Sequence, residues 1–171
     1  LLIDWRGAAG AAAVASACNR VPNLDLRVNR LRSSPSQVQQ DLAAAGISSE
    51  PIFGCPDGLR ISGHSGDLRQ WPGYAEGHWC VQDCSAQSIA PLLDPQPGDR
   101  ILDACAAPGG KATHVAELVG DQAEIWAVDR SAGRLKRVAA NAARLGLASI
   151  NALAADAANL LEQRPQWRES F

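Results

Sequence analysis

The stretch "LDACAAPGGKATH", residues 102–114, decides the fold, because an apolar segment runs directly into a proline, two glycines and a lysine. The residues before the bend, "PGDRILDACA", are typical of a turn followed by a buried strand. The residues after it, "KATHVAELVG", are typical of a helix that ends at Gly120. The bend itself is made of small residues that let backbone amides approach a ligand closely, namely Ala106, Ala107, Gly109 and Gly110. The sequence therefore predicts a ligand-binding loop between a strand and a helix.

Two common nucleotide-binding loops do not match this bend. A phosphate-binding Walker loop has the pattern G-x-x-x-x-G-K-[ST], but Cys105 stands where its first glycine belongs and Ala112 where its hydroxyl belongs. The dinucleotide fingerprint G-x-G-x-x-G fits poorly as well, because Gly109 and Gly110 are neighbours that follow Pro108. We therefore reject the Walker loop and give the dinucleotide site little weight.

The segments that follow the bend predict a parallel α/β sheet. Both "AEIWAVD" and "SINALAADA" read as strands, and "SAGRLKRVAANAARLG" between them reads as a helix capped by Ser131. Its polar residues are expected to face solvent: Arg134, Lys136, Arg137 and Asn141. Strands that alternate with helices form parallel sheets with right-handed crossovers, and such sheets bind ligands at the carboxyl ends of their strands.

Two acids at those strand ends favour a nucleoside as the ligand. Asp129 lies 20 residues after Gly109, about the offset of a carboxylate that accepts hydrogen bonds from both ribose hydroxyls. Asp156 ends the third strand, beside the expected place of an adenine ring. The loop offers a single basic residue, Lys111, so a nucleoside without phosphates fits better than a nucleotide. S-adenosylmethionine is such a ligand.

The first part of the chain predicts a smaller unit. The stretch "LDLRVN" alternates like a strand, "SPSQVQQDLAAAG" reads as a helix capped by Ser34, and "EPIF" and "GLRIS" read as two further strands. We expect the chain to divide into an upstream helical end at 1–18, a small β-α-β-β subdomain at 19–62, a connector at 63–79 and half of an α/β domain at 80–171. Within the last region, "VQDCSAQSIAPLL" is expected to form one short helix that Pro91 kinks or ends.

Composition narrows the class of protein. The apolar fraction is 46% and the charged fraction 20%, as in soluble globular proteins, and no run is apolar enough to span a membrane. The net charge is −2, which excludes nucleic-acid binding by bulk positive charge, so any RNA contact must be local. None of the five cysteines forms a C-x-x-C pair, so we expect no metal site and a reduced, cytoplasmic protein. We also expect a monomer. Without a methionine at its start, the chain reads as a fragment.

Three stretches together resemble one enzyme family: "ILDACAAPGGKATH", the upstream "GYAEGHWCVQDCSAQ" and the downstream "AVDRSAGRLKRVAANAARLG". They are similar to the Sun/Nop family of RNA cytosine-5 methyltransferases, and in particular to its bacterial members that act on small-subunit ribosomal RNA. The resemblance implies a Rossmann-like α/β domain that uses S-adenosylmethionine, present here as its N-terminal half, behind a small α+β RNA-binding subdomain.

The resemblance also implies roles for individual residues. The cofactor loop would consist of Cys105, Ala106, Ala107, Pro108, Gly109, Gly110 and Lys111. Asp129 would hold the ribose and Asp156 would lie at the adenine. Ribosomal RNA would be the partner, and the local basic cluster "RVNRLR" would contact its backbone through Arg27, Arg30 and Arg32. Cys105 is expected to be a small buried residue of the loop.

The family adds a cysteine thiolate to carbon 6 of cytosine before carbon 5 accepts the methyl group. It carries its two active cysteines in Pro-Cys and Thr-Cys contexts. Neither context occurs here, because the residues that precede the cysteines are Ala17, Gly54, Trp79, Asp83 and Ala104. We therefore expect no catalytic residue in this piece, which would be inactive by itself, with the nucleophile beyond Phe171. A methyltransferase that acts on nitrogen and a non-catalytic RNA-binding or assembly factor remain as alternatives.

Overall fold

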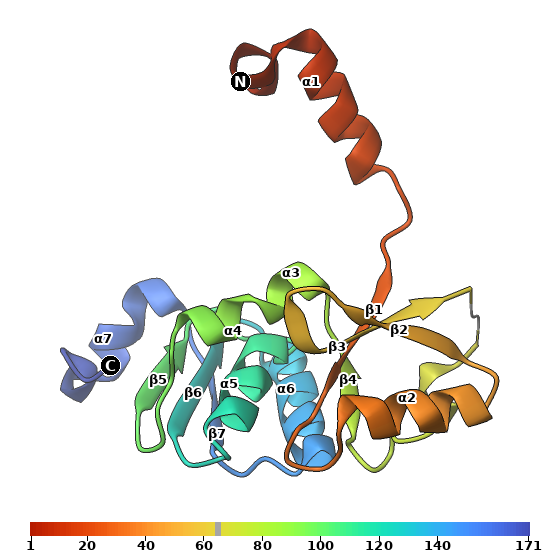
Figure 1. Ribbon diagram of the computed structural model, residues 1–171. Helices are drawn as coiled ribbons and strands as arrows, with labels where there is room; N and C mark the ends of the chain where they lie inside the picture. Colours follow the sequence, from red (N-terminus) through yellow and green to blue (C-terminus); the bar gives the residue numbers. More distant parts are fainter. Residues whose placement is uncertain (64–65) are drawn as a thin grey trace.

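The computed structural model describes residues 1–63 and 66–171, and its strands form two sheets. The first helix, α1 (Leu2–Cys18), stands away from the rest of the molecule, and an extended segment leads from it to the first strand (Figure 1). His64 of the expected connector lies outside the described residues. None of the described helices is both long and apolar enough to cross a lipid bilayer.

The first sheet is antiparallel, with the strand order β2-β3-β1-β4. Its strands are β1 (Leu24–Val28), β2 (Ser48–Ile52), β3 (Cys55–Ser62) and β4 (Trp79–Val81). Helix α2 (Pro35–Ala44) covers the sheet, and it begins as expected, because the Ser34 hydroxyl accepts a hydrogen bond from the Gln37 amide. Its buried Val38 and Leu42 pack against Leu26 and Trp79 in one apolar cluster. We call this unit, β1–β4 with α2, the small subdomain.

Strand β4 is the element of the small subdomain that the sequence did not predict. It lies across the expected boundary at residue 80, and it pairs with β1 so that Leu26 stands opposite Val81. A strand is recognised in a sequence by apolar and polar residues that alternate over several positions, and a strand of three residues is too short to show this alternation. The pairing draws the start of the second region into the first sheet.

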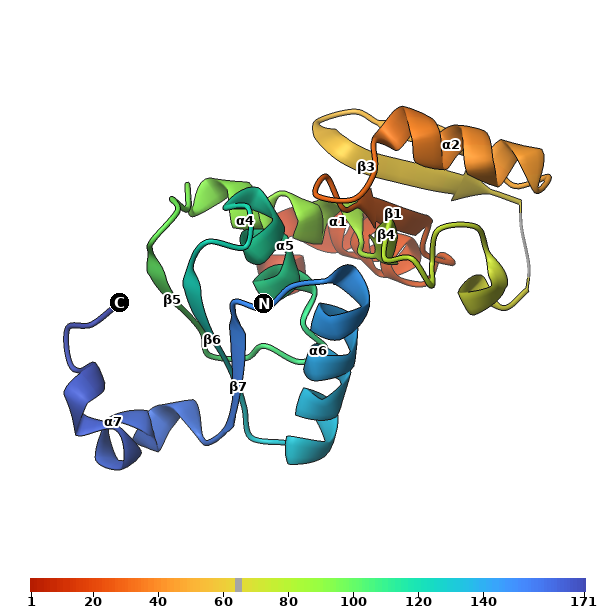
Figure 2. The ribbon, with the colours of Figure 1, turned by 90° about the horizontal axis from the view of Figure 1, so that it is seen from below.

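The second sheet is parallel, with the order β5-β6-β7. Its strands are β5 (Arg100–Asp103), β6 (Glu124–Asp129) and β7 (Ile150–Ala154). One face is covered by α5 (Gly110–Leu118) and α6 (Ala132–Leu145) (Figures 1 and 2). The predicted fold class, a parallel α/β sheet behind a small α+β unit, is confirmed.

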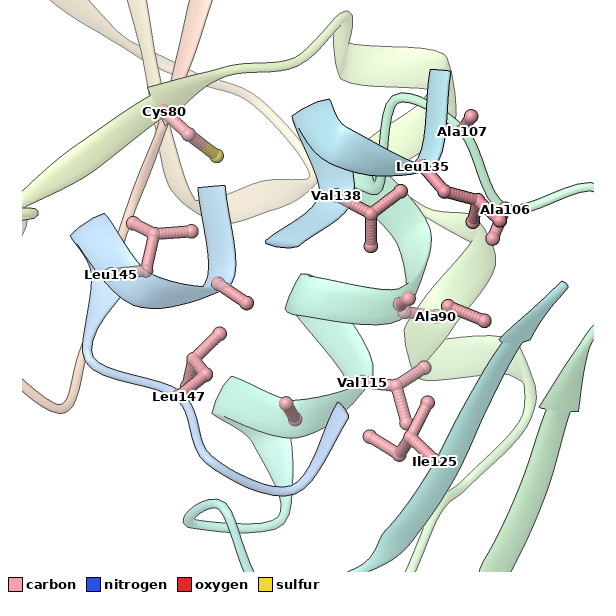
Figure 3. Close-up of a cluster of buried hydrophobic side chains, with 14 residues drawn as sticks. Cys80, Ala90, Ala106, Ala107, Val115, Ile125, Leu135, Val138, Leu145 and Leu147 are labelled. Atoms are coloured by element: carbon pink, nitrogen blue, oxygen red, sulfur yellow. The ribbon is translucent and has the colours of Figure 1, made fainter. Parts of the chain in front are cut away.

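The core between this sheet and its helices also joins the two units. Figure 3 shows Val115 of α5, Ile125 of β6 and Val138 of α6 converging there, with the Cys80 side chain of β4 pointing toward the same cluster. A strand of the first sheet thus contributes to the core of the second. The two sheets are therefore parts of one packed body.

The opposite face of the parallel sheet is covered by the end of the chain. Three short helices follow β7 there: η2 (Ala157–Asn159), α7 (Leu160–Gln163) and η3 (Pro165–Trp167) (Figure 2). The Trp167 ring packs on Trp126 of β6 at a centroid distance of 4.8 Å. Phe171 lies beneath the guanidinium of Arg100, at the free edge of β5.

The expected single helix before β5 is two short helices, so that prediction was wrong. They are α3 (Cys84–Gln87) and α4 (Ile89–Leu92), and the break between them falls at Ser88. Pro91 has no amide hydrogen, but it lies in the first turn of α4, where amide groups have no carbonyl partner within the helix, so no hydrogen bond is lost.

Candidate functional site

The 105–111 loop leaves strand β5 at its carboxyl end and is anchored to the neighbouring strand and to α6. The Ala106 amide donates to the Val128 carbonyl at 2.9 Å, and the Gly109 amide turns back to the Ala106 carbonyl at 2.7 Å. Gly109 has φ of +106°, and a Cβ there would lie 3.2 Å from the Val138 backbone. Only glycine combines this conformation with so close an approach to α6, so the glycine at position 109 has a steric cause.

Asp129, at the end of β6, is held in place by this loop. Its carboxylate accepts hydrogen bonds from the Ser131 amide at 2.9 Å and from the Ala107 amide at 3.3 Å, and it faces the Arg134 guanidinium at 3.4 Å. The hydrogen bond from Ser131 is the main cause that lowers the pKa of Asp129, with Arg134 acting in the same direction. The side chain is therefore an oriented carboxylate at neutral pH.

Asp156 lies near Asp129, just beyond β7. It caps η2 by accepting the Ala158 amide at 3.0 Å, and its carboxylate lies 3.8 Å from the Arg130 guanidinium. A pocket of about 300 Å³ opens at this point, and its lining comprises Ala104, Cys105, Asp129, Arg130, Arg134, Asp156 and Ala157. Three of the predicted cofactor residues, Cys105, Asp129 and Asp156, thus meet at one pocket.

The other predicted loop residues lie around this pocket without lining it. Ala106 and Ala107 are buried in the core cluster, and Gly109 is buried against Val138 of α6. Lys111 lines a second, apolar cavity of about 370 Å³ between α4, α5 and the free edge of β5. Cys105 is exposed, so the expectation that it would be buried was wrong. The Cys105 amide donates a hydrogen bond to the Asp103 carboxylate.

Two residues of α6 that were expected to face solvent also hold the loop; Arg134 is exposed as expected, whereas Asn141 is partly buried. The Arg134 guanidinium donates to the Ala107 carbonyl at 2.7 Å, and the Asn141 amide donates to the Pro108 carbonyl at 3.1 Å. Lys136 and Arg137 are exposed, as expected. Arg134 stands in the first turn after the Ser131 cap, and a helix that starts at the carboxyl edge of a sheet presents this turn to the preceding loop. That position was the signal available in the sequence.

Asp103 is an acid beside the bend that the sequence reasoning missed, although it does not line the pocket of Asp129 and Asp156. It is the last residue of β5, it accepts the Cys105 amide at 3.2 Å, and it lines the apolar cavity together with Lys111. Burial raises the pKa of its carboxyl, against the lowering effect of the Cys105 amide and Lys111. Its place as the acid that ends the strand before the bend could have identified it, just as the same place identified Asp129 on β6.

The predicted RNA-binding cluster is mostly structural. Arg27 is completely buried and cannot contact RNA in this fold, so that assignment was wrong. Arg32 is exposed but donates to the carbonyls of Leu145 and Glu76, at 2.9 and 3.0 Å. Arg30 is also exposed, and its guanidinium lies 3.5 Å from Asp57 without the carbonyl partners that hold Arg32. In the structure Arg27 points from β1 toward α5, and four of its five hydrogen bonds go to residues of that helix.

The structure describes one group of side chains with the spacing of metal ligands, formed by Asp25, Asp83 and Cys84. The Asp25 carboxylate already accepts two hydrogen bonds from the Arg60 guanidinium, at 2.8 and 3.0 Å. A guanidinium in that position repels a cation, so these residues do not fit a metal ion. All five cysteines are free thiols.

Comparisons with known families agree with this architecture. Residues 90–167 match the family model of the 16S rRNA methyltransferase RsmB/F, and residues 4–66 match the ferredoxin-like domain of RsmF/B-like methyltransferases. A methyltransferase homolog from Pyrococcus horikoshii is 25% identical in sequence and superposes with a TM-score of 0.82, over 92% of this chain and 52% of that protein.

Curated relatives in sequence have names that agree with these family models. The chain is 52% identical, over 77% of its length, to a probable ribosomal RNA small subunit methyltransferase B of Synechocystis. It is 41% identical, over 91% of its length, to the ribosomal RNA small subunit methyltransferase B of Pseudomonas syringae. It spans 30% and 33% of the lengths of these two proteins. The chain therefore belongs to the RsmB/F family of 16S rRNA methyltransferases.

Proposed function

We propose that this chain provides the S-adenosylmethionine site and the small RNA-binding subdomain of an enzyme that methylates carbon 5 of a cytosine in small-subunit ribosomal RNA. The observation that carries the proposal is the pocket at which Cys105, Asp129 and Asp156 meet beside the 105–111 loop. The names of the curated relatives support ribosomal RNA as the substrate. The cytosine and its carbon 5 follow from the resemblance to the Sun/Nop family.

Each residue of the pocket has a chemical role in this proposal. Asp129 is an ionised acceptor whose position is fixed by two backbone amides, and a carboxylate of this kind suits two ribose hydroxyls. Asp156 lies at the rim, where an adenine ring can contact it. The 105–111 loop accommodates the amino-acid end of the cofactor. When bound, S-adenosylmethionine supplies an electrophilic methyl group on a sulfonium.

The proposal assigns no nucleophile to this chain. Cys105 is exposed at the pocket, but it belongs to the loop itself, and its amide donates to the Asp103 carboxylate. Cys80 is buried, and burial raises the pKa of its thiol, which suppresses the reactive thiolate. The relatives are about three times as long as the matched region, and we assign the chemistry on the base to their remaining part.

Isothermal titration calorimetry with S-adenosylmethionine tests the proposal. We expect one binding site in the unchanged chain. Asp129→Asn should weaken binding by about 10- to 100-fold, because hydrogen bonds to a charged acceptor contribute roughly 1.5–3 kcal/mol each. Asn keeps an oxygen for the Ser131 amide, so this variant should remain folded, which circular dichroism can verify. Asp41→Ala in α2 is the matched control and should bind normally. A chain that does not bind the cofactor, or that binds it equally well as Asp129→Asn, would contradict the proposal.

A further inference from the structure

The buried Arg27 links the small subdomain to the first turn of α5. Its guanidinium has five N–H groups, and each of them donates a hydrogen bond. Two of these bonds go to the carboxylate of Glu117, which neutralises the buried charge, and a third goes to the side-chain oxygen of Gln82. A completely buried arginine with every donor satisfied is held in one geometry, so it can fix the position of whatever else it contacts.

The remaining two bonds reach the start of α5. One goes to the Gly110 carbonyl at 2.8 Å and the other to the Thr113 hydroxyl oxygen at 3.1 Å. The Thr113 hydroxyl in turn donates to the Gly109 carbonyl at 2.9 Å. The carbonyls of both loop glycines are thereby held, directly or through one side chain, by a residue that lies more than 80 positions earlier in the chain.

We infer that Arg27 is a positioning residue for the cofactor loop, so that the small subdomain forms part of the cofactor site. The inference rests on the proposed function, because it concerns the same loop and the same cofactor. The amides of the 105–111 loop can meet a ligand only when the two glycines are correctly placed. Arg27 sets that placement at Gly110 and, through Thr113, at Gly109, whereas Arg134 and Asn141 of α6 hold the carbonyls of Ala107 and Pro108.

The same interface supplies a matched control that does not touch the loop. Asn29 is completely buried two residues further along the chain, and its side-chain amide donates to the carbonyls of Gly77 and Leu145. Leu145 stands at the far end of α6, away from the 105–111 loop. Asn29→Ala therefore weakens the contact between the two units without removing a bond to the loop.

The experiment compares Arg27→Lys and Asn29→Ala for S-adenosylmethionine affinity by calorimetry, at a temperature where both variants are folded. Lysine keeps the charge but has three donors on one atom, and it cannot reach Glu117, Gly110 and Thr113 together. We expect Arg27→Lys to weaken binding by at least about tenfold, roughly one charge-assisted hydrogen bond, and Asn29→Ala by less than about twofold. Both variants should lower Tm.

A double variant separates loop position from stability. Arg27→Met with Glu117→Leu removes both buried charges, which is often neutral for stability, but it also removes the bonds to the loop. We expect its Tm to recover relative to Arg27→Lys while the affinity stays low. In the unliganded chain, amide hydrogen exchange at residues 105–111 should be faster in Arg27→Lys and in the double variant than in Asn29→Ala.

The outcomes that overturn the inference differ from those that overturn the proposed function. Equal affinity and equal loop exchange in the Arg27 variants and the unchanged chain would overturn the inference alone. An affinity loss in Asn29→Ala as large as that in Arg27→Lys would do the same, because the effect would then belong to the whole interface. A chain that does not bind S-adenosylmethionine, with loop exchange that still depends on Arg27, would overturn the proposed function and leave Arg27 as a positioning residue of a loop without that ligand.

Discussion

The guanidinium of Arg27 and the carboxylate of Glu117 form a bidentate ion pair between strand β1 and helix α5, with N–O distances of 3.0 and 2.8 Å. Their side chains are only 0% and 4% exposed. The two residues lie 90 positions apart, so the pair joins the small subdomain to the parallel sheet. Both charges are out of water, and each depends on the other to remain there.

Removal of one member of this pair should cost much of the stability of the protein. Glu117→Ala leaves the Arg27 charge buried without its partner, and we expect the free energy of unfolding to fall by about 3–5 kcal/mol. Urea denaturation at neutral pH measures the change. Glu124→Ala, which breaks an exposed ion pair with Arg100 and a hydrogen bond from the Trp126 indole, is the control and should cost much less. Similar losses of unfolding free energy in the two variants would show that the buried pair stabilises the fold no more than the exposed pair does.

His114 predicts a dependence of stability on pH. Burial, reinforced by the charge of Arg27, lowers the pKa of its imidazole to about 3. In the unfolded chain the pKa is about 6.5, so the unfolded state takes up a proton first and stability falls as the pH decreases from about 6.5 toward 3. Between pH 7 and pH 5 this single group should remove about 2 kcal/mol.

Urea denaturation at several pH values between 7 and 5, for the unchanged chain and for His114→Gln, isolates this effect. Carboxyl groups titrate in both chains, so the difference between the two pH profiles reports on His114. We expect the profile of His114→Gln to be flatter. Parallel profiles would mean that the pKa of His114 is the same in the folded and unfolded states, which would contradict the lowering by burial.

Gly109→Ala should disturb the loop more than a comparable substitution elsewhere. At φ of +106° a Cβ is strained, and here it would also lie 3.2 Å from the Val138 backbone, so the loop must move. We expect a loss of about 1–3 kcal/mol in stability and a clear loss of S-adenosylmethionine affinity. Gly120→Ala, at φ of +65° with open space around it, controls for strain and should keep its affinity. Normal binding by Gly109→Ala would argue against a role for the loop backbone.

If the basic cluster contacts RNA, we expect Arg30 to contribute, because its side chain is exposed and is not held by backbone carbonyls as Arg32 is. We expect Arg30→Ala to reduce the slope of log affinity for 16S rRNA against log salt by about one, since one phosphate contact is lost. Filter binding over a range of salt concentrations gives this slope. Asp57→Ala should leave the slope unchanged or raise it, because it removes the acid beside Arg30. An Arg30 variant with the slope of the unchanged chain would remove this residue from the RNA surface.

The sequence predicted the features that short-range patterns encode. The strand, bend and helix at residues 102–118 follow from a run of apolar residues interrupted by proline and glycine, and Asp129 follows from the end of the next strand. Both lie where the pattern put them, at the carboxyl edge of a parallel sheet. The Ser34 and Ser131 caps were visible for the same reason, since each accepts an amide three residues away.

The features that the sequence did not predict depend on partners far along the chain. Arg27 reads as one more basic residue of "RVNRLR" until the fold brings Glu117 to it. The place of Arg134 in the first turn of α6 pointed toward the loop, but nothing nearby in the sequence marks the carbonyls that Arg134 and Asn141 bind, 27 and 33 residues earlier. Strand β4 forms because it pairs with β1, and a segment of three residues is too short for its sequence pattern to predict that pairing.

A crystal structure of the chain with the stable analogue sinefungin would show whether the pocket beside the 105–111 loop holds S-adenosylmethionine. We expect density in the pocket lined by Cys105, Asp129 and Asp156, with the ribose hydroxyls on the Asp129 carboxylate and the adenine beside Asp156. Density in the apolar cavity at the free edge of β5 instead, or a pocket that stays empty at saturating sinefungin, would contradict this expectation.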